Sequence, residues 1–392
     1  MRTAITAEKL WDGRRFLDNP VILIEDGRIA SIASRADGEL PGQARVFDFR
    51  GATLAPAFLD VHIHGAAGHD VMEATPEALA AIGSLLAECG TACFLATTVT
   101  APLDATLSAL SGLAKLIREF EMRDANAEPL ARPLGIHLEG PFLSHAKRGV
   151  HPSEFLLEPD IAIFDRLFDA ADGFVRLMTL APELPGAVGL AAHAAARGVR
   201  VSVGHSNATA AETRAVIAAG AVSATHTFNA MRPLDHHEPG ILGIVLTDDS
   251  LFAELICDGI HNTPEMVKLW WRAKGPQRAI LITDAMSATG MPEGEYQLGT
   301  FAVQVANGRA TLNGALAGSV LTLNKALANF IAFTGAPLDR ALPLLTRNPA
   351  AMAGLERSAS SLAVGQPANL VAVDDTGDLV ASIMGGLPVA GD

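Results

Sequence analysis

The sequence predicts an α/β protein: a (β/α)8 TIM-type barrel with a small β-sandwich module built from both chain ends. Two observations carry this prediction. In the central region, short apolar runs alternate with Ala/Leu/Glu-rich stretches of helical length, which is the pattern of repeated βα units around a parallel sheet. At both chain ends, the pattern changes to short apolar runs separated by turn signals.

The central region contains eight candidate strands, the number that closes a barrel of this type. They are predicted at residues 57–63, 91–98, 134–139, 175–180, 199–204, 222–226, 251–257 and 279–283. Helices are predicted between several of them, at 76–89, 103–120, 186–197, 209–219 and 263–273. Thr75 is expected to cap the first helix, with Pro76 at its first position.

The two chain ends have the same β-rich character. Asp-Gly pairs at 12–13 and 26–27 divide residues 3–50 as hairpin turns would. The C-terminal stretch LAVGQPANLVAVD, at 362–374, reads in the same way. We therefore expect residues 1–52 and 351–392 to pair in one module, beside a barrel formed by residues 53–350.

Composition limits the class of protein. The 392 residues are 49% hydrophobic and 18% charged, which is typical of a globular chain. The formal net charge of −14 argues against nucleic acid or an anionic membrane as a partner, because both need an extended basic surface. A small anionic substrate remains open if a local pocket supplies positive charge.

Compartment and membrane attachment can also be predicted. The three cysteines, Cys89, Cys93 and Cys257, lie in apolar segments, so reduced thiols in a cytoplasmic protein are expected. The N-terminus has no hydrophobic stretch of signal-peptide length. Charges, Gly and Pro interrupt every apolar run before the ~18 residues that span a bilayer.

The segment APAFLDVHIHG places two histidines on the first barrel strand. Side chains at i and i+2 of a strand point the same way, so His62 and His64 leave the strand end together. Each imidazole needs partners for its N–H and its lone pair. Two satisfied core histidines and a metal-chelating pair both fit this spacing, and the rest of the chain must decide between them.

Side chains suited to chemistry follow the ends of five of the eight predicted strands. In a (β/α)8 barrel these ends meet at one mouth, where the active site lies. Each residue alone has an ordinary explanation, such as a turn, a helix cap or a backbone hydrogen bond. Six such residues at matched positions favour a shared metal site. They are His62 and His64 on the first strand, Glu139 on the third, His205 on the fifth, His226 on the sixth and Asp284 on the eighth.

The types of ligand limit the metal and its chemistry. Imidazole and carboxylate without thiolate suit Zn, and also Fe, Mn or Co. A catalytic metal of this kind lowers the pKa of bound water to about 7 and polarises a carbonyl, which favours hydrolysis. A nearby carboxylate would take the water's proton and pass it to a leaving amine. Asp284, alone at the end of the last strand, is the residue expected to do so.

Five segments, PAFLDVHIHG, HLEGPF, VGHS, THTFNAM and ITDAM, together resemble the amidohydrolase superfamily and, within it, the N-acetylglucosamine-6-phosphate deacetylases. The resemblance covers nearly the whole chain, including the split β module. HLEGPF is quite specific, because many other amidohydrolases use a carboxylated lysine on the fourth strand. The fourth strand here, RLMTLAPE, has no lysine.

The resemblance implies one or two divalent metal ions. The principal ion would be held by Glu139, His205 and His226, and a second by His62 and His64.

The resemblance also implies roles around the substrate. Asp284 matches the catalytic acid/base, and His151 matches the histidine that orients the acetamido carbonyl. Asn229, the backbone of Ala230 and His261 match contacts to the substrate phosphate. The stretch LAGSVLTLN, at 316–324, resembles the loop lining the sugar and acetyl pocket, beginning with Leu316, Ala317 and Gly318.

One position departs from the family pattern. Family members commonly carry an arginine just before Glu-Pro-Gly, whereas RPLDHHEPG here has His237, which is shorter and only partly charged near neutrality. Arg232 in the same loop would be a substitute, and His236 and His237 fit a solvated loop equally well. Family members form homodimers in which this loop reaches the neighbouring site, so a homodimer is expected. His69 and His145 are interpreted as structural or surface residues.

The expected function is metal-dependent deacetylation of N-acetylglucosamine 6-phosphate to glucosamine 6-phosphate and acetate. The alternatives are the same hydrolysis of another N-acetyl amino sugar, namely N-acetylgalactosamine 6-phosphate or unphosphorylated N-acetylglucosamine, and a non-catalytic sugar-binding barrel. A cyclic-amide hydrolase is disfavoured because such enzymes usually rely on the missing lysine.

Overall fold

The computed structural model describes residues 2–37, 44–122, 129–299, 301–359 and 361–389. Those parts of the two predicted module segments that fall on residues 1, 38–43, 360 and 390–392 lie outside the described residues. Among the described residues, no helix is long and apolar enough to cross a membrane.

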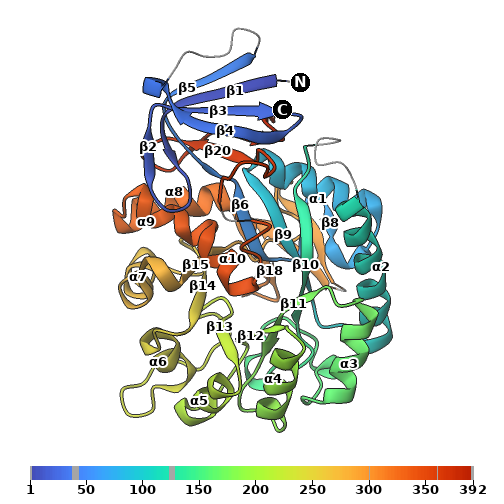
Figure 1. The fold of residues 1–392 in the computed structure, drawn as a ribbon. Coiled ribbons are helices and arrows are strands. Elements are labelled where there is room, and N and C mark those ends of the chain that lie inside the picture. The colour runs from blue at the N-terminus through green and yellow to red at the C-terminus, as the bar shows by residue number, and fades with distance from the viewer. Residues whose placement is uncertain (1, 38–43, 123–128, 300, 360, 390–392) are drawn as a thin grey trace.

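A parallel eight-stranded barrel forms the centre of the molecule, as predicted (Figure 1). Neighbouring strands pair in chain order, and a parallel bridge between Ile63 and Ala285 joins the first strand to the last. Helices cover the outside, so strands such as the first two are buried along their whole length. The strands are β6 (Phe58–Ile63), β9 (Thr91–Thr98), β10 (Arg132–Glu139), β11 (Val175–Leu180), β12 (Arg200–Val203), β13 (Ala221–Ala224), β14 (Phe252–Ile256) and β15 (Ala279–Ile282).

All five predicted helices are present, as α1 (Pro76–Glu88), α2 (Leu103–Met122), α4 (Ala187–Ala196), α5 (Ala210–Ala218) and α7 (Pro264–Arg278). Thr75 caps α1, because its side chain accepts a hydrogen bond from the backbone N–H of Ala78. α7 runs further than predicted, across a break at Gly275, where φ is +61°. Helices not predicted are α3 (Ile161–Ala170), α6 (Gly240–Thr247), α8 (Leu323–Thr334), α9 (Leu338–Ala341) and α10 (Arg347–Ala353).

The two chain ends share one sheet beside the barrel, as predicted (Figure 1). The C-terminal strand β20 pairs antiparallel with β5, with Leu370 opposite Pro56. Both Asp-Gly pairs lie between antiparallel partners, at the β1–β2 and β3–β4 turns. The predicted boundaries at 52/53 and 350/351 remain predictions. The strands are β1 (Arg2–Trp11), β2 (Phe16–Asp18), β3 (Pro20–Glu25), β4 (Arg28–Ser34), β5 (Arg45–Pro56), β20 (Leu370–Val373), β21 (Leu379–Met384) and β22 (Leu387–Pro388).

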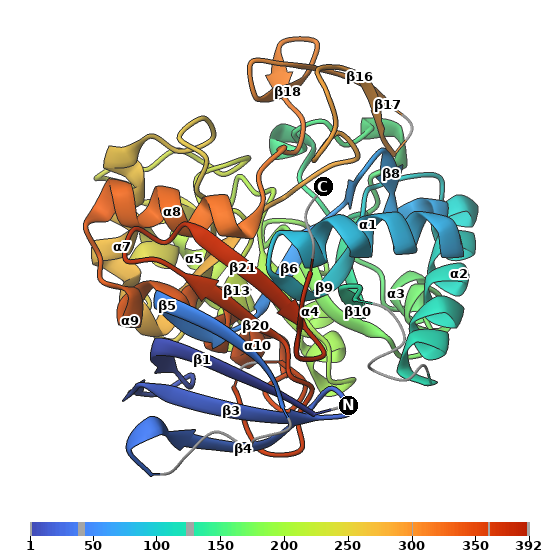
Figure 2. The ribbon, with the colours of Figure 1, turned by 90° about the horizontal axis from the view of Figure 1, so that it is seen from above.

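A small antiparallel meander follows β15 and was not predicted. It projects from the rest of the molecule in Figure 2 and packs through its own apolar cluster, in which Leu298 and Val303 lie with Met286. The meander follows the C-terminal end of β15, the last barrel strand. It therefore lies on the side of the barrel where the C-terminal strand ends open. Its strands are β16 (Gly294–Leu298), β17 (Phe301–Ala306), β18 (Arg309–Leu312) and β19 (Ala315–Leu316).

Candidate metal centre and active site

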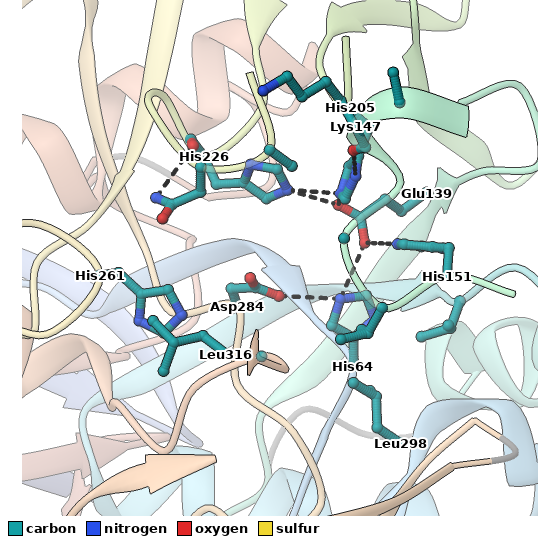
Figure 3. Close-up of a pocket in the computed structure, with 17 residues that line it drawn as sticks. His64, Glu139, Lys147, His151, His205, His226, His261, Asp284, Leu298 and Leu316 are labelled. Atoms are coloured by element: carbon teal, nitrogen blue, oxygen red, sulfur yellow. Dashed lines mark hydrogen bonds and ion pairs between the residues drawn. The ribbon is translucent and has the colours of Figure 1, made fainter. Parts of the chain in front are cut away.

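Most of the predicted site residues line one cavity of about 320 Å³ at the C-terminal ends of the barrel strands (Figure 3), and His62 lies just behind its lining. His205, His226 and Asp284 each lie two residues past a strand end, and each has a left-handed backbone, with φ of +44°, +29° and +52°. Left-handed backbone is costly for residues other than glycine and concentrates at functional sites. Here it accompanies the abrupt turn that brings three side chains off their strands and into the mouth.

Three of these side chains form a compact triangle of potential ligand atoms. His226 Nε2 lies 3.1 Å from Glu139 Oε1 and 3.0 Å from His205 Nε2, and His205 Nε2 lies 3.3 Å from the same oxygen. Ligand atoms bound tetrahedrally at about 2.0 Å from an ion are separated by about 3.3 Å. The Glu139, His205 and His226 side chains therefore have the spacing of a metal site.

His62 on β6, and His64 one residue past its end, lie beside this triangle. His64 Nε2 is 3.2 Å from Glu139 Oε2 and 3.1 Å from Asp284 Oδ1. His62 Nε2 is 3.3 Å from Glu139 Oε1 and 3.5 Å from Asp284 Oδ1. Glu139 thus faces histidine nitrogen atoms with both oxygens: His62 approaches the oxygen that faces the triangle, and His64 approaches the other.

Hydrogen bonds at Nδ1 turn the Nε2 atoms of two histidines toward the site. The carbonyl oxygens of Thr97 and Lys147 accept from Nδ1 of His64 and His205, at 3.1 and 2.9 Å. A carbonyl can only accept, so in each neutral ring the proton is on Nδ1 and the lone pair on Nε2. His62 Nε2 is buried with no hydrogen-bond partner among the described residues, which is the environment a metal ion would complete.

His151 has the opposite tautomer. The backbone N–H of Thr100 donates to His151 Nδ1 at 3.3 Å, and the Thr100 hydroxyl lies 2.8 Å from the same nitrogen and can donate to it too; with both donating, the proton of the neutral ring is on Nε2. By distance alone His151 also groups with Glu139 and His205 as a possible metal ligand. Its tautomer argues against that role, since a protonated nitrogen has no lone pair for an ion. His151 Nε2 lies 3.5 Å from Glu139 Oε2 and can donate a hydrogen bond to a carbonyl oxygen in the cavity.

The carboxylates and histidines determine each other's charge. Burial opposes ionisation of His64, but hydrogen bonds to Asp284 and Glu139 outweigh it and raise the pKa of His64 to about 9. Burial also opposes ionisation of Asp284, but His62 and His64 outweigh it and lower that pKa to about 2. At neutral pH Asp284 is therefore an ionised base. Burial lowers the pKa of His205 to about 4, which keeps its imidazole neutral.

Asp284 is held by backbone hydrogen bonds on both sides. Its N–H donates to the carbonyl of His62 at 2.9 Å, and its carbonyl accepts from the N–H of Ser319 at 2.7 Å. Gly318, with φ of +65°, packs so closely that an added Cβ would lie 3.2 Å from the Asp284 carbonyl oxygen. The aspartate is thus fixed between β6 and the 316–319 loop.

The structure brings most of the predicted substrate-contacting residues into the cavity lining, but not all of them. Arg232, His237 and Ala317 are not among the described residues that line it. Lys147 lines the cavity and was not identified from the sequence, where it lies in an exposed-looking run of basic residues. The predicted residues that do line it are His151, Asn229, Ala230, His261, Leu316 and Gly318.

Glu254 is a buried acidic residue beneath the site that sequence reasoning missed. It lies on β14 and is fully buried, with Oε2 3.4 Å from His62 Nδ1 and 3.4 Å from the backbone nitrogen of His226. A charged residue inside the apolar run LFAELIC was the available signal. Carboxylates in this position orient a histidine and raise its strength as a metal ligand.

We expect Glu254→Gln to weaken metal binding by about 10- to 100-fold, because Gln keeps the shape but loses the negative charge facing His62. Metal affinity, measured by competition with a chromogenic chelator, tests this. The matched control is Glu265→Gln on the exposed start of α7, which should bind metal as the parent does. Equal affinity in all three proteins would rule out the orienting role of Glu254.

The fold and site agree with the comparisons with known proteins. The amidohydrolase family model matches residues 53–389, and the chain belongs to this family. It is 37% identical to N-acetylgalactosamine-6-phosphate deacetylase of Escherichia coli O157:H7, covering 95% of this chain and 96% of that one. It is 35% identical to N-acetylglucosamine-6-phosphate deacetylase of Bacillus subtilis, covering 94% and 92%.

A solved structure of the same kind aligns over the full length of both chains. It is a mutant N-acetyl-D-glucosamine-6-phosphate deacetylase from Mycobacterium smegmatis in complex with N-acetyl-D-glucosamine-6-phosphate. The sequences are 36% identical and the TM-score is 0.90. The sequence-based expectation of an amidohydrolase of the deacetylase type is therefore confirmed.

Proposed function

We propose that this protein hydrolyses the acetamide of N-acetylglucosamine 6-phosphate, giving glucosamine 6-phosphate and acetate. The observation that carries the proposal is the convergence of Glu139, His205 and His226 at 3.0–3.3 Å, with Asp284 across the same cavity. A binding barrel without catalysis would have no need of an ionised aspartate in that place. The relatives bearing this activity cover almost the whole chain.

The donor set fits a divalent cation, and zinc is the ion we propose because the ligands are imidazole and carboxylate. Glu139, His205 and His226 would hold one ion, and His62 and His64 a second. The chemistry supplied by a cation there is Lewis acidity toward a carbonyl and a lowered pKa of bound water.

Two side chains of the protein would carry the protons and orient the amide. His151 Nε2–H would donate to the acetyl carbonyl oxygen, where negative charge develops as water adds to the carbon. Asp284, ionised at neutral pH, would take the proton of the attacking water. The same carboxylic acid would then protonate the sugar nitrogen, so that the C–N bond breaks and a neutral amine leaves.

The phosphate would lie at the other end of the cavity. Asn229, the backbone N–H of Ala230 and His261 line that part of it and are the contacts we propose. Asp258 Oδ2 lies 2.6 Å from His261 Nδ1 and can only accept, so His261 donates from Nδ1.

We further propose a cytoplasmic homodimer. Half-buried Arg232 and exposed His237 are not among the described residues that line this chain's own cavity, which is consistent with a loop that serves a neighbouring protomer. The protein's formal net charge of −14 argues against an anionic surface as a partner. The odd number of apolar, unpaired cysteines fits a reducing compartment.

N-acetylgalactosamine 6-phosphate is the second candidate substrate. The relative from E. coli O157:H7 named for that sugar is as similar to this chain as those named for the glucose epimer. The two sugars differ only in the configuration of one hydroxyl, so the site geometry described above suits the acetamide and the phosphate of both.

Initial rates on three substrates test the function. We expect kcat/KM on N-acetylglucosamine 6-phosphate to exceed that on N-acetylglucosamine by about 100-fold or more, because charge-assisted hydrogen bonds contribute roughly 1.5–3 kcal/mol each. Acetate release from the zinc-loaded protein is the readout, with N-acetylgalactosamine 6-phosphate as the third arm. A preference for the galactose epimer would establish the second candidate instead. No hydrolysis of any of the three by metal-loaded protein would refute the deacetylase.

A further inference from the structure

A second cavity, of about 200 Å³, lies between the β module and the barrel, far along the chain from the site residues. The module contributes the turn between β1 and β2, and the barrel contributes the ends of α7, α9 and α10 (Figure 1). α7 ends where β15 begins, so this cavity lies at the N-terminal end of the strand whose C-terminal end leads to Asp284. It is therefore separate from the mouth.

The charge of this lining differs from that of the protein as a whole. Although the chain carries a net charge of −14, the lining contains four arginines and a single acid, Asp339. Repulsion between like charges held in one place has to be offset by water or by an anion. The four arginines are Arg14, Arg15, Arg340 and Arg347.

Three of these arginines are available to bind a ligand. Arg14, Arg340 and Arg347 make no ion pair with any described residue, and Arg15 has only a long contact of 3.8 Å with Asp12. Here the donors of three guanidinium groups remain free for an external acceptor.

The walls that carry the arginines are held in place. The Asp12 carboxylate accepts hydrogen bonds from the backbone N–H groups of Arg14 and Arg15, at 2.8 and 2.9 Å, which fixes the turn that presents them. On the barrel side, the buried Asn348 donates to the carbonyls of Pro276 and Ala279, at 2.9 and 2.8 Å. Asn348 is the chain neighbour of Arg347, so this wall is fixed as well.

We propose that this cavity binds a phosphate group, either as inorganic phosphate or on a small phosphate ester. Guanidinium groups present paired donors that match the oxygens of phosphate, and they bind it more specifically than a single point charge does. Phe16, which is 41% exposed, and Pro343 supply an apolar edge that would contact the organic part of an ester. Bound anion would link the β module to the barrel.

Titration calorimetry with inorganic phosphate tests this site on the full-length, metal-loaded protein. We expect Arg340→Gln together with Arg347→Gln to remove one bound phosphate per chain, or to weaken its binding at least tenfold, relative to the parent. The matched control combines Arg214→Gln and Arg272→Gln, two exposed arginines outside this lining, and should bind phosphate as the parent does. Phosphate bound at the catalytic mouth would be the same in all three proteins.

Two further arms complete the test. A second double variant, Arg14→Gln with Arg15→Gln on the module side, should weaken phosphate binding as well. It tests the site independently of the barrel variant, Arg340→Gln with Arg347→Gln. Ribose 5-phosphate, which has no acetamide, distinguishes an ester from the free ion by whether it binds more tightly than phosphate. Deacetylation by the barrel variant should stay within about twofold of the parent. Equal stoichiometry and affinity in the parent and both cavity variants would show that the arginines form a solvated surface only.

Discussion

Asp284→Asn is expected to lower kcat by at least about 1,000-fold while the ion held by Glu139, His205 and His226 stays bound. Loss of a general acid–base typically costs 10²- to 10⁴-fold, and here one carboxylate would serve both proton transfers. Asn cannot accept the proton of water or return it to the leaving nitrogen. The residue makes no contact shorter than 3.1 Å with the histidines of the site, so the triangle of ligands stays complete.

Steady-state rates and metal analysis after dialysis measure the two halves of this result. Asp104→Asn, an exposed aspartate in the first turn of α2, is the control for the general effect of removing a carboxylate, and should retain full activity. An Asp284→Asn protein with near-normal kcat would show that another group moves the protons. If the Asp284→Asn protein had also lost all its metal, Asp284 would be needed to bind the metal, and the loss of activity would not show that it acts as a base.

Glu139→Gln is expected to remove both the metal and the activity. One carboxylate faces five histidines: Oε1 lies 3.1–3.3 Å from the Nε2 atoms of His62, His205 and His226, and Oε2 lies within 3.5 Å of His64 and His151. The Gln variant keeps the volume but loses the charge. Its amide nitrogen also brings hydrogens toward atoms whose lone pairs bind the ion.

We expect metal affinity to fall by more than about 100-fold, beyond the effect of losing a residue that only orients a ligand. Metal per chain after dialysis and rates with zinc added back both report it. The Glu254→Gln protein is the matched comparison, because it loses a buried carboxylate of the same site without losing a ligand. If Glu139→Gln retained one ion per chain at parent affinity, the proposed role of Glu139 as a metal ligand would be wrong.

The barrel strands could be predicted because each is an apolar run bounded by helix or turn signals, and the parallel sheet buries both faces. α6 was harder, because its sequence GILGIVLT contains two glycines and reads more like a buried strand than a helix. α3 carried a signal in Asp160, whose side chain caps the helix by accepting from the N–H of Ile163. The meander strands β16–β19 interrupt the βα alternation, so the pattern of the barrel does not predict them.

The convergence of the candidate ligands could be predicted because side chains that follow the C-terminal ends of barrel strands meet at one mouth in this fold. The tautomers could not, because they depend on partners distant in the chain: Thr100 donates to a histidine 51 residues later. Local patterning also gives no account of which loop residues reach the cavity. Arg232 and His237 illustrate this, since their loop positions resemble those of contact residues yet lie outside this chain's own lining.

The barrel closes where β6 meets β15, and that seam bears His62 on one side and Asp284 on the other. A growing chain therefore holds no complete centre until the last strand has been synthesised and has docked. Catalytic activity should therefore appear only once the barrel has closed, whereas the ion held by Glu139, His205 and His226 needs no residue of that seam.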